Sequence, residues 1–219
     1  MYRRFFAVAA AAAAFMFAGA ASAQQTSVGV SAGTTGLGLD LGYDLNDAFG
    51  MRANGNWFSL SKDVESDGVN YDGKLKLKSL GLLADFYPFE SGFRVTGGAY
   101  YNDNHVRLNA TPTGNVNIGG TSYTPAQIGS LNGDADFNEF TPYAGIGYTT
   151  NRGEPGLSFV ADAGIMFQGR PEITLVGTGP IASSPTFQAD LARERDQIRD
   201  DLKWTRFYPA VRVGLAYRF

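Results

Sequence analysis

The C-terminal segment 207–219 alternates strictly between apolar side chains and polar or small ones. Its odd positions, from Phe207 to Phe219, are all apolar or aromatic, whereas its even positions carry Arg212, Arg218, one tyrosine and small residues. Successive side chains of a β-strand point to opposite faces, so this pattern predicts a strand with one apolar face.

Earlier segments alternate in the same way, which makes eight predicted strands with the last one. The others cover residues 26–32, 37–45, 49–59, 75–87, 93–104, 140–149 and 157–168. Several reach the ~9–11 residues that a tilted membrane strand requires. Between Leu77 and Leu80 the apolar positions change parity, which predicts a β-bulge.

Alternation fits a soluble sandwich as well as a membrane barrel, but two further patterns favour the barrel. Aromatic side chains recur eight residues apart on the apolar face, in the pairs Phe49–Trp57, Phe93–Tyr101, Phe140–Tyr148 and Phe159–Phe167. Eight residues of a tilted strand span roughly 20 Å, close to the ~25 Å apolar band between the interfacial aromatic girdles. Glycines concentrate on the opposite face, where the narrow lumen of a small barrel has little room.

The connections between the predicted strands also alternate in length. The turns at 46–48, 88–92 and 151–156 are short, whereas the connections at 60–74, 105–139 and 169–206 are long, as in outer-membrane barrels. Within the last long connection, residues 184–203 predict a helix, because Ser184 can cap it and Pro185 suits its first turn. This helix either packs on the barrel mouth or serves as a partner-binding element or lid.

Residues 1–23 have the pattern of a secretory signal peptide. Arg3 and Arg4 precede an apolar run over 5–17, and the sequence at 21–23 fits a small-residue cleavage site. A transmembrane anchor is the alternative, although the run is short for a span. We therefore expect residues 24–219 to form one barrel domain. The chain has no cysteine, and its formal net charge of −3 gives no support for a nucleic-acid partner.

The C-terminal sequence Gly214-Leu215-Ala216-Tyr217-Arg218-Phe219 resembles the terminal signal of outer-membrane barrels. With its eight strands, the chain resembles the small outer-membrane barrels of the OmpA/OmpX/OmpW-like superfamily. This resemblance implies an all-β, eight-stranded antiparallel transmembrane barrel in the cell outer membrane of a Gram-negative bacterium. It also implies contact with outer-membrane lipids and lipopolysaccharide, and recognition of Gly214, Tyr217 and Phe219 by the barrel-assembly machinery.

Strand parity turns six charged side chains toward the predicted lumen. They are Asp40, Arg52, Asp85, Arg94, Asp162 and Arg212, and Asp44 and Arg218 are candidates to join them near the periplasmic end. Three acids and three bases can form a closed ion-pair network, which satisfies the requirement that buried charges are paired. The alternative is a charged constriction of a narrow pore, although eight strands enclose little free space.

Few residues are candidates for catalysis or metal binding. Lipid A deacylases resemble this architecture and carry a histidine two residues before a nucleophilic serine, but the only histidine here, His105, is followed at that spacing by Arg107. The acidic segment 63–68 begins like a calcium loop, yet its twelfth position is Lys74, where a bidentate glutamate is needed. We therefore expect no enzyme activity, no cofactor and no specific metal site.

These patterns predict a non-enzymatic surface barrel that contributes to envelope structure or to surface contacts. A narrow, porin-like channel for ions or small polar solutes is the alternative function. The two functions differ in whether the purified barrel conducts ions across a bilayer.

Overall fold

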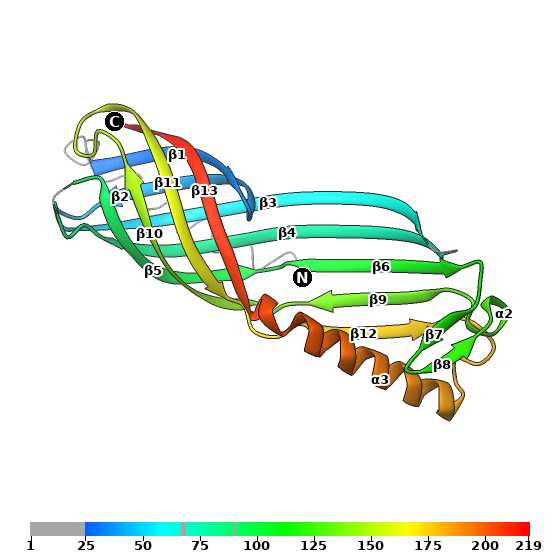
Figure 1. Ribbon diagram of the computed structural model, residues 1–219. Coiled ribbons are helices and arrows are strands. Elements are labelled where there is room, and N and C mark those ends of the chain that lie inside the picture. The colour runs from blue at the N-terminus through cyan, green and yellow to red at the C-terminus, as the bar shows by residue number, and fades with distance from the viewer. Residues whose placement is uncertain (1–24, 67–68, 90) are drawn as a thin grey trace, which may run out of the picture.

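The computed structural model describes residues 25–66, 69–89 and 91–219, and its main feature is a closed antiparallel β-barrel (Figure 1). The predicted signal peptide lies outside the described residues. In ring order the eight barrel strands are β1 (Thr26–Gly33), β2 (Gly36–Asp44), β3 (Phe49–Ser66), β4 (Val69–Phe86), β5 (Phe93–Asn102), β10 (Phe140–Thr149), β11 (Gly156–Phe167) and β13 (Phe207–Arg218). Pairing of β13 with β1 closes the ring, so the predicted fold class is confirmed.

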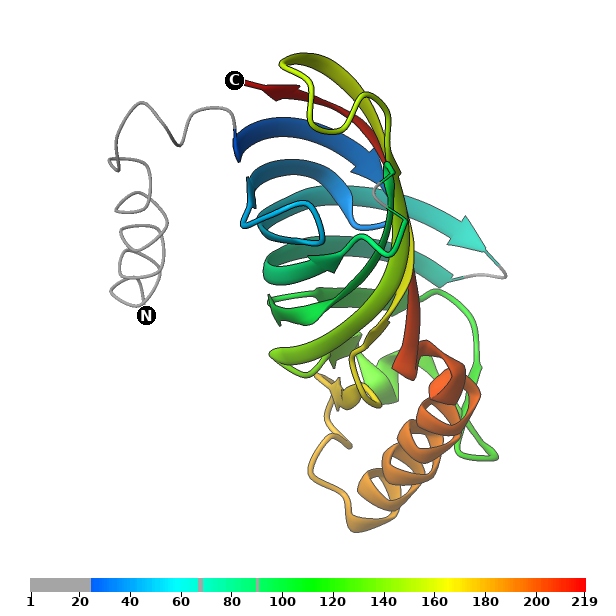
Figure 2. The same cartoon turned by 90° about the vertical axis from the view of Figure 1, so that its left-hand side faces the viewer.

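The outer wall of the barrel is apolar and exposed. Val30, Leu82 and Val213 point away from the lumen and are 57%, 61% and 51% exposed. In water such a continuous apolar surface is unfavourable, whereas in a bilayer it contacts lipid. The end view in Figure 2 shows the strands wrapped around a common axis, with the connecting segments gathered beyond one end.

The strands β3 and β4 have 18 residues each and continue well beyond the barrel. Near the barrel β4 pairs with β5, but over residues 69–76 it pairs instead with β6 (His105–Pro112). Next in order come β9 (Leu131–Asp136) and β12 (Glu172–Gly177). We call the outer halves of β3 and β4, together with β6, β9 and β12, the extended sheet. Much of the length of the connections predicted at 60–74, 105–139 and 169–206 forms this sheet.

The prediction of a β-bulge in β4 is wrong. The β3–β4 register runs without interruption from the pair Phe49–Phe86 to the pair Ser66–Val69. What changes along β4 is the environment of each face. The outward positions are apolar at Leu80 and Leu82, where they face lipid, and become lysines such as Lys76 in the extended sheet, where they face water.

A small helical cap packs against the end of the extended sheet. It consists of the hairpin β7 (Val116–Ile118) and β8 (Thr121–Tyr123), the short helix α2 (Pro125–Ile128), and the helix α3 (Pro185–Asp201), which leads through the 3-10 helix η3 (Leu202–Arg206) into β13. The predicted helix in the last long connection is confirmed as α3. Its buried residues Phe187 and Leu191 pack with Ile118, Tyr123 and Ile128. None of the helices within the described ranges is long and apolar enough to cross a membrane.

Candidate functional site

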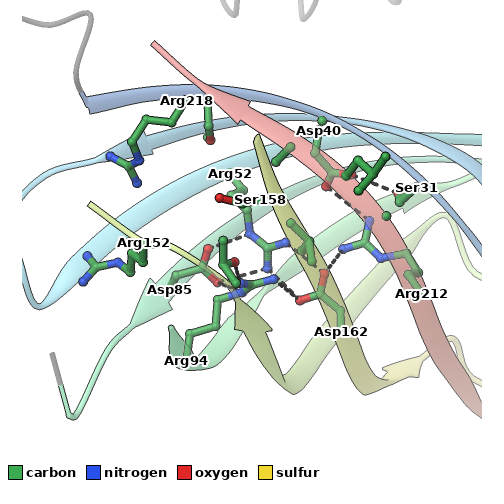
Figure 3. Close-up of a pocket in the computed structure, with 18 of the residues that line it drawn as sticks. Ser31, Asp40, Arg52, Asp85, Arg94, Arg152, Ser158, Asp162, Arg212 and Arg218 are labelled. Carbon is green, nitrogen blue, oxygen red and sulfur yellow. Dashed lines mark hydrogen bonds and ion pairs between the residues drawn. The ribbon is translucent and has the colours of Figure 1, made fainter. Parts of the chain in front are cut away.

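The six charged residues predicted to face the lumen lie together at its centre (Figure 3). Each comes from a different strand, because every ring strand turns alternate side chains inward. Asp40 lies on β2, Arg52 on β3, Asp85 on β4, Arg94 on β5, Asp162 on β11 and Arg212 on β13. We call these six residues the lumen network.

Asp162 is the centre of the lumen network, because three arginines contact its carboxylate. Its Oδ2 accepts hydrogen bonds from Arg52 Nη1 at 3.1 Å and from Arg212 Nη2 at 3.2 Å. Its Oδ1 accepts a hydrogen bond from Arg94 Nη2 at 2.6 Å. A planar guanidinium directs its donors in a fixed fork, so three of them hold this carboxylate in one orientation.

The other two carboxylates complete the lumen network. Asp85 accepts two hydrogen bonds from Arg52, from Nε at 2.6 Å and from Nη2 at 3.1 Å, and a third from the Thr96 hydroxyl at 2.5 Å. Asp40 accepts hydrogen bonds from Arg212 Nη1 at 3.3 Å and from the Asn54 amide at 2.9 Å. Each carboxylate of the lumen network therefore accepts a hydrogen bond from an arginine. Each also accepts at least one more, either from a second arginine or from a neutral side chain.

Four of the six residues of the lumen network are buried, and the side chains of Arg52 and Asp40 are 11% and 17% exposed. Arg94 and Asp85 are each 1% exposed, and Arg212 and Asp162 are also buried. Ions removed from water need compensating charges and hydrogen bonds, and the three acids balance the three bases. A cavity of about 60 Å³ adjoins the network on the periplasmic side. This cavity is large enough to hold water molecules.

An apolar cluster fills part of the lumen on the outer side of the lumen network, beside the buried and hydrogen-bonded side chains of Asn54, Asn56 and Ser79. It is formed by Leu83, Tyr100, Tyr143, Met166 and Ala210, and we call it the tyrosine plug. The two tyrosine rings pack edge to face, with their centroids 5.6 Å apart.

Glycine makes room for the tyrosine plug. A Cβ atom at Gly81 would lie 2.5 Å from a ring carbon of Tyr100, and one at Gly164 would lie 2.5 Å from the Tyr143 hydroxyl. The concentration of glycine on the polar face was the sequence signal for this packing. It does not say which tyrosines fill the space, because that depends on which strands face each other across the lumen.

The remaining predicted site residues lie apart from the lumen network. Asp44 and Arg218 pair with each other near the periplasmic end. Gly214 faces the lumen beside Ser31, whereas Tyr217 and Phe219 lie on the outside with their rings 5.3 Å apart. The role of these C-terminal residues in assembly stays a prediction.

His105 is the first residue of β6 in the extended sheet and follows the end of ring strand β5 at Asn102 by three residues. Its Nδ1 lies 2.6 Å from Asp136 Oδ1, and its Nε2 lies 3.1 Å from Asp134 Oδ1. Of the acidic segment 63–68, residues 63–66 belong to β3, and residues 67–68 lie outside the described residues. Across the part of the chain that the structure describes, no three His, Asp or Glu side chains are arranged to hold a metal ion.

Comparison with solved structures places this architecture among known folds. The crystal structure of CarO2 from Acinetobacter baumannii superimposes with a TM-score of 0.61 at 23% identity, covering 89% of this chain and 98% of that chain. The crystal structure of CarO from the same organism gives a TM-score of 0.60 at 21% identity, covering 90% and 98%. The chain has the fold of a small outer-membrane β-barrel. No protein-family model and no curated protein sequence matches it.

This outer-membrane barrel agrees with the predicted resemblance in fold and in location. The ring of strands and the exposed apolar wall suit the outer membrane, because a closed barrel pairs every backbone group inside the bilayer. The extended sheet then projects from the side of the long connections, which is the outer side in this class of protein (Figure 1).

Proposed function

We propose that the protein is a non-enzymatic surface barrel, in which a closed lumen provides a rigid membrane anchor for the extended sheet and its helical cap. The observation that carries this proposal is the double closure of the lumen, by the lumen network and by the tyrosine plug. A barrel with this interior contributes to the envelope through its outer wall and its projecting surface.

The charge balance of the lumen argues against a conducting path. In an ion-selective pore, charged rings leave part of their field free for the passing ion. Here Asp162 is neutralised by three arginines, and Asp85 by Arg52 and Arg94. A permeating ion would also have to pass the packed rings of Tyr100 and Tyr143 and the buried, hydrogen-bonded side chains of Asn54 and Asn56, where it would lose part of its hydration shell.

The surroundings of His105 argue against hydrolytic chemistry. Its two ring nitrogens contact Asp134 and Asp136, and neither contact supplies a serine, threonine or cysteine nucleophile for the histidine to activate. The position two residues on, Arg107, is committed to Asp134 at 2.9 Å. We also infer that lipids and lipopolysaccharide contact the apolar wall, and that the assembly machinery reads the C-terminal residues.

Planar-bilayer recording on the purified, refolded protein tests this proposal. We expect no discrete conductance steps from the wild-type barrel, because the lumen has no continuous aqueous path. The double variant Tyr100→Gly and Tyr143→Gly removes both rings of the tyrosine plug but leaves the lumen network in place, so its conductance shows how much of the closure the plug provides. Regular conductance steps from the wild-type protein, with ion selectivity changed by Arg212→Ala, would favour the narrow channel instead.

A further inference from the structure

A cavity of about 350 Å³ lies at the outer mouth of the barrel, between the base of the extended sheet and η3. Leu75 and Leu77 of β4 and Val106 of β6 form one wall, and Trp204 and Pro209 form the other. The remaining lining residues are Thr34, Asn104, Phe137, Gln168, Thr205 and Tyr208. We call this space the mouth cavity, and it shares no lining residue with the cavity beside the lumen network.

The lining of the mouth cavity carries no formal charge. None of its eleven residues is an aspartate, glutamate, lysine, arginine or histidine. A charged ligand placed there would lose hydration without gaining an ionic partner, which is strongly unfavourable. The mouth cavity is therefore complementary to an uncharged molecule.

Several polar groups around the mouth cavity have hydrogen-bond partners within the protein. The Tyr208 hydroxyl donates to Thr34 O at 2.5 Å, and the Thr205 hydroxyl donates to Leu202 O at 2.7 Å. Gln168 donates from Nε2 to Thr205 O at 3.0 Å, and its unpartnered Oε1 is enclosed by surrounding atoms. A ligand would thus be held by apolar contact and shape rather than by a set of hydrogen bonds.

Apolar surface leads from the outside into the mouth cavity. Across the β3–β4 pairing, Leu75 is opposite Leu60 and Leu77 is opposite Phe58, so these side chains share the lumen-side face of the extended sheet. Leu60 and Phe58 are 49% and 41% exposed. On the same sheet, α3 packs near β12, where Gly177 lies against the Phe187 ring. The part of the extended sheet beside the mouth cavity remains accessible.

We propose that the mouth cavity binds a small, uncharged and predominantly apolar molecule from the outer side of the barrel. Its volume is at the lower end of the ~300–1,000 Å³ range of small-molecule sites, which suits a compound built around one aromatic ring or a short alkyl chain. Binding there needs no passage through the lumen, so this site is independent of whether the barrel conducts.

The two tryptophans of the chain provide matched reporters for this proposal. Trp204 lines the mouth cavity and is 66% exposed, whereas Trp57 points outward from β3 into the apolar wall and is 48% exposed. In the Trp57→Phe variant, para-bromobenzyl alcohol should quench Trp204 fluorescence in a saturable manner. In the Trp204→Phe variant, partition of the same probe into detergent should quench Trp57 only in proportion to its concentration. Equal, unsaturable quenching of both reporters would overturn the proposal.

Neighbouring residues on β4 give a matched pair of substitutions. In the Trp57→Phe background, Leu77→Glu places a charge in the mouth cavity and should weaken probe binding at least tenfold, whereas Lys76→Glu changes the opposite face and should leave it unaltered. If Leu77→Glu fails to give the heat-modifiable folded form, Val106→Phe fills the mouth cavity without adding charge and should weaken binding similarly. The anionic probe para-bromobenzoate should show no saturable binding. Unchanged binding in both cavity variants, or equal affinity for both probes, would refute the site.

Discussion

Replacing Arg94 by alanine tests the lumen network most directly. Arg94 contributes one of the three guanidinium groups around Asp162, and its Nε lies 3.7 Å from Asp85. Its removal leaves three acids facing two bases in a region where Asp85 is 1% exposed. Breaking a buried ion pair in this way typically costs about 3–5 kcal/mol, because the remaining charge is no longer compensated. Arg52 and Arg212 still contact Asp162, and water can enter the adjoining cavity, so we expect the lower end of that range.

Urea unfolding of the refolded protein in lipid vesicles, followed by tryptophan fluorescence, measures this loss. Arg107→Ala is the matched control, since Arg107 forms an ion pair with Asp134 but its side chain is 61% exposed. Solvent screening limits that pair to about 0.2–1 kcal/mol. If Arg94→Ala lowers the free energy of unfolding no more than Arg107→Ala does, the lumen is hydrated and the argument for a closed barrel fails.

Three further outcomes follow from the same structure. Deleting Phe219 should slow membrane insertion and lower the outer-membrane yield, and an unchanged yield would contradict the assembly role of the C-terminal residues. Val211→Arg should lower the free energy of unfolding by about 2–4 kcal/mol, because it places a charge near the bilayer midplane. Leu215→Arg lies closer to the interface and should lower it by about 0–1 kcal/mol. Equal unfolding free energies of the two variants in vesicles would refute this depth assignment. Gly81→Ala should destabilise the barrel by about 1–3 kcal/mol, since the added Cβ would lie 2.5 Å from Tyr100, and a neutral effect in the same assay would show that the tyrosine plug is loosely packed.

The barrel strands could be predicted because each face of a membrane-spanning strand has a single environment along its whole length. Lipid contacts one face and the lumen the other, so the side chains of β13 reveal the strand and its orientation without knowledge of its neighbours. The same parity places Asp162 and Arg212 inside. It cannot show that Asp162 contacts three arginines, because Arg52 approaches it from the opposite side of the ring and Arg94 from two strands away.

The extended sheet was not predictable by the same rule, because its two faces exchange environments. Beyond the membrane, the outward face of β4 meets water at Lys76, and the lumen-side face becomes the apolar one at Leu75. A change in the parity of the apolar positions along a sequence can therefore arise from a β-bulge or from a change of the solvent that each face meets. Only the uninterrupted β3–β4 register distinguishes the two.

Sequence alone determined the alternation, the closure into an outer-membrane type of barrel and the set of charges that face inward, since these depend on the two-residue period of a strand and on its solvent. Tertiary structure decided which charges pair, which tyrosines fill the lumen and where the mouth cavity opens. The mouth cavity, for example, arises because the ring order and the β4–β6 pairing bring together Trp204, Val106 and Leu77, which are distant in the chain. Contacts between such segments depend on strand order and register, which the period of a single strand does not encode.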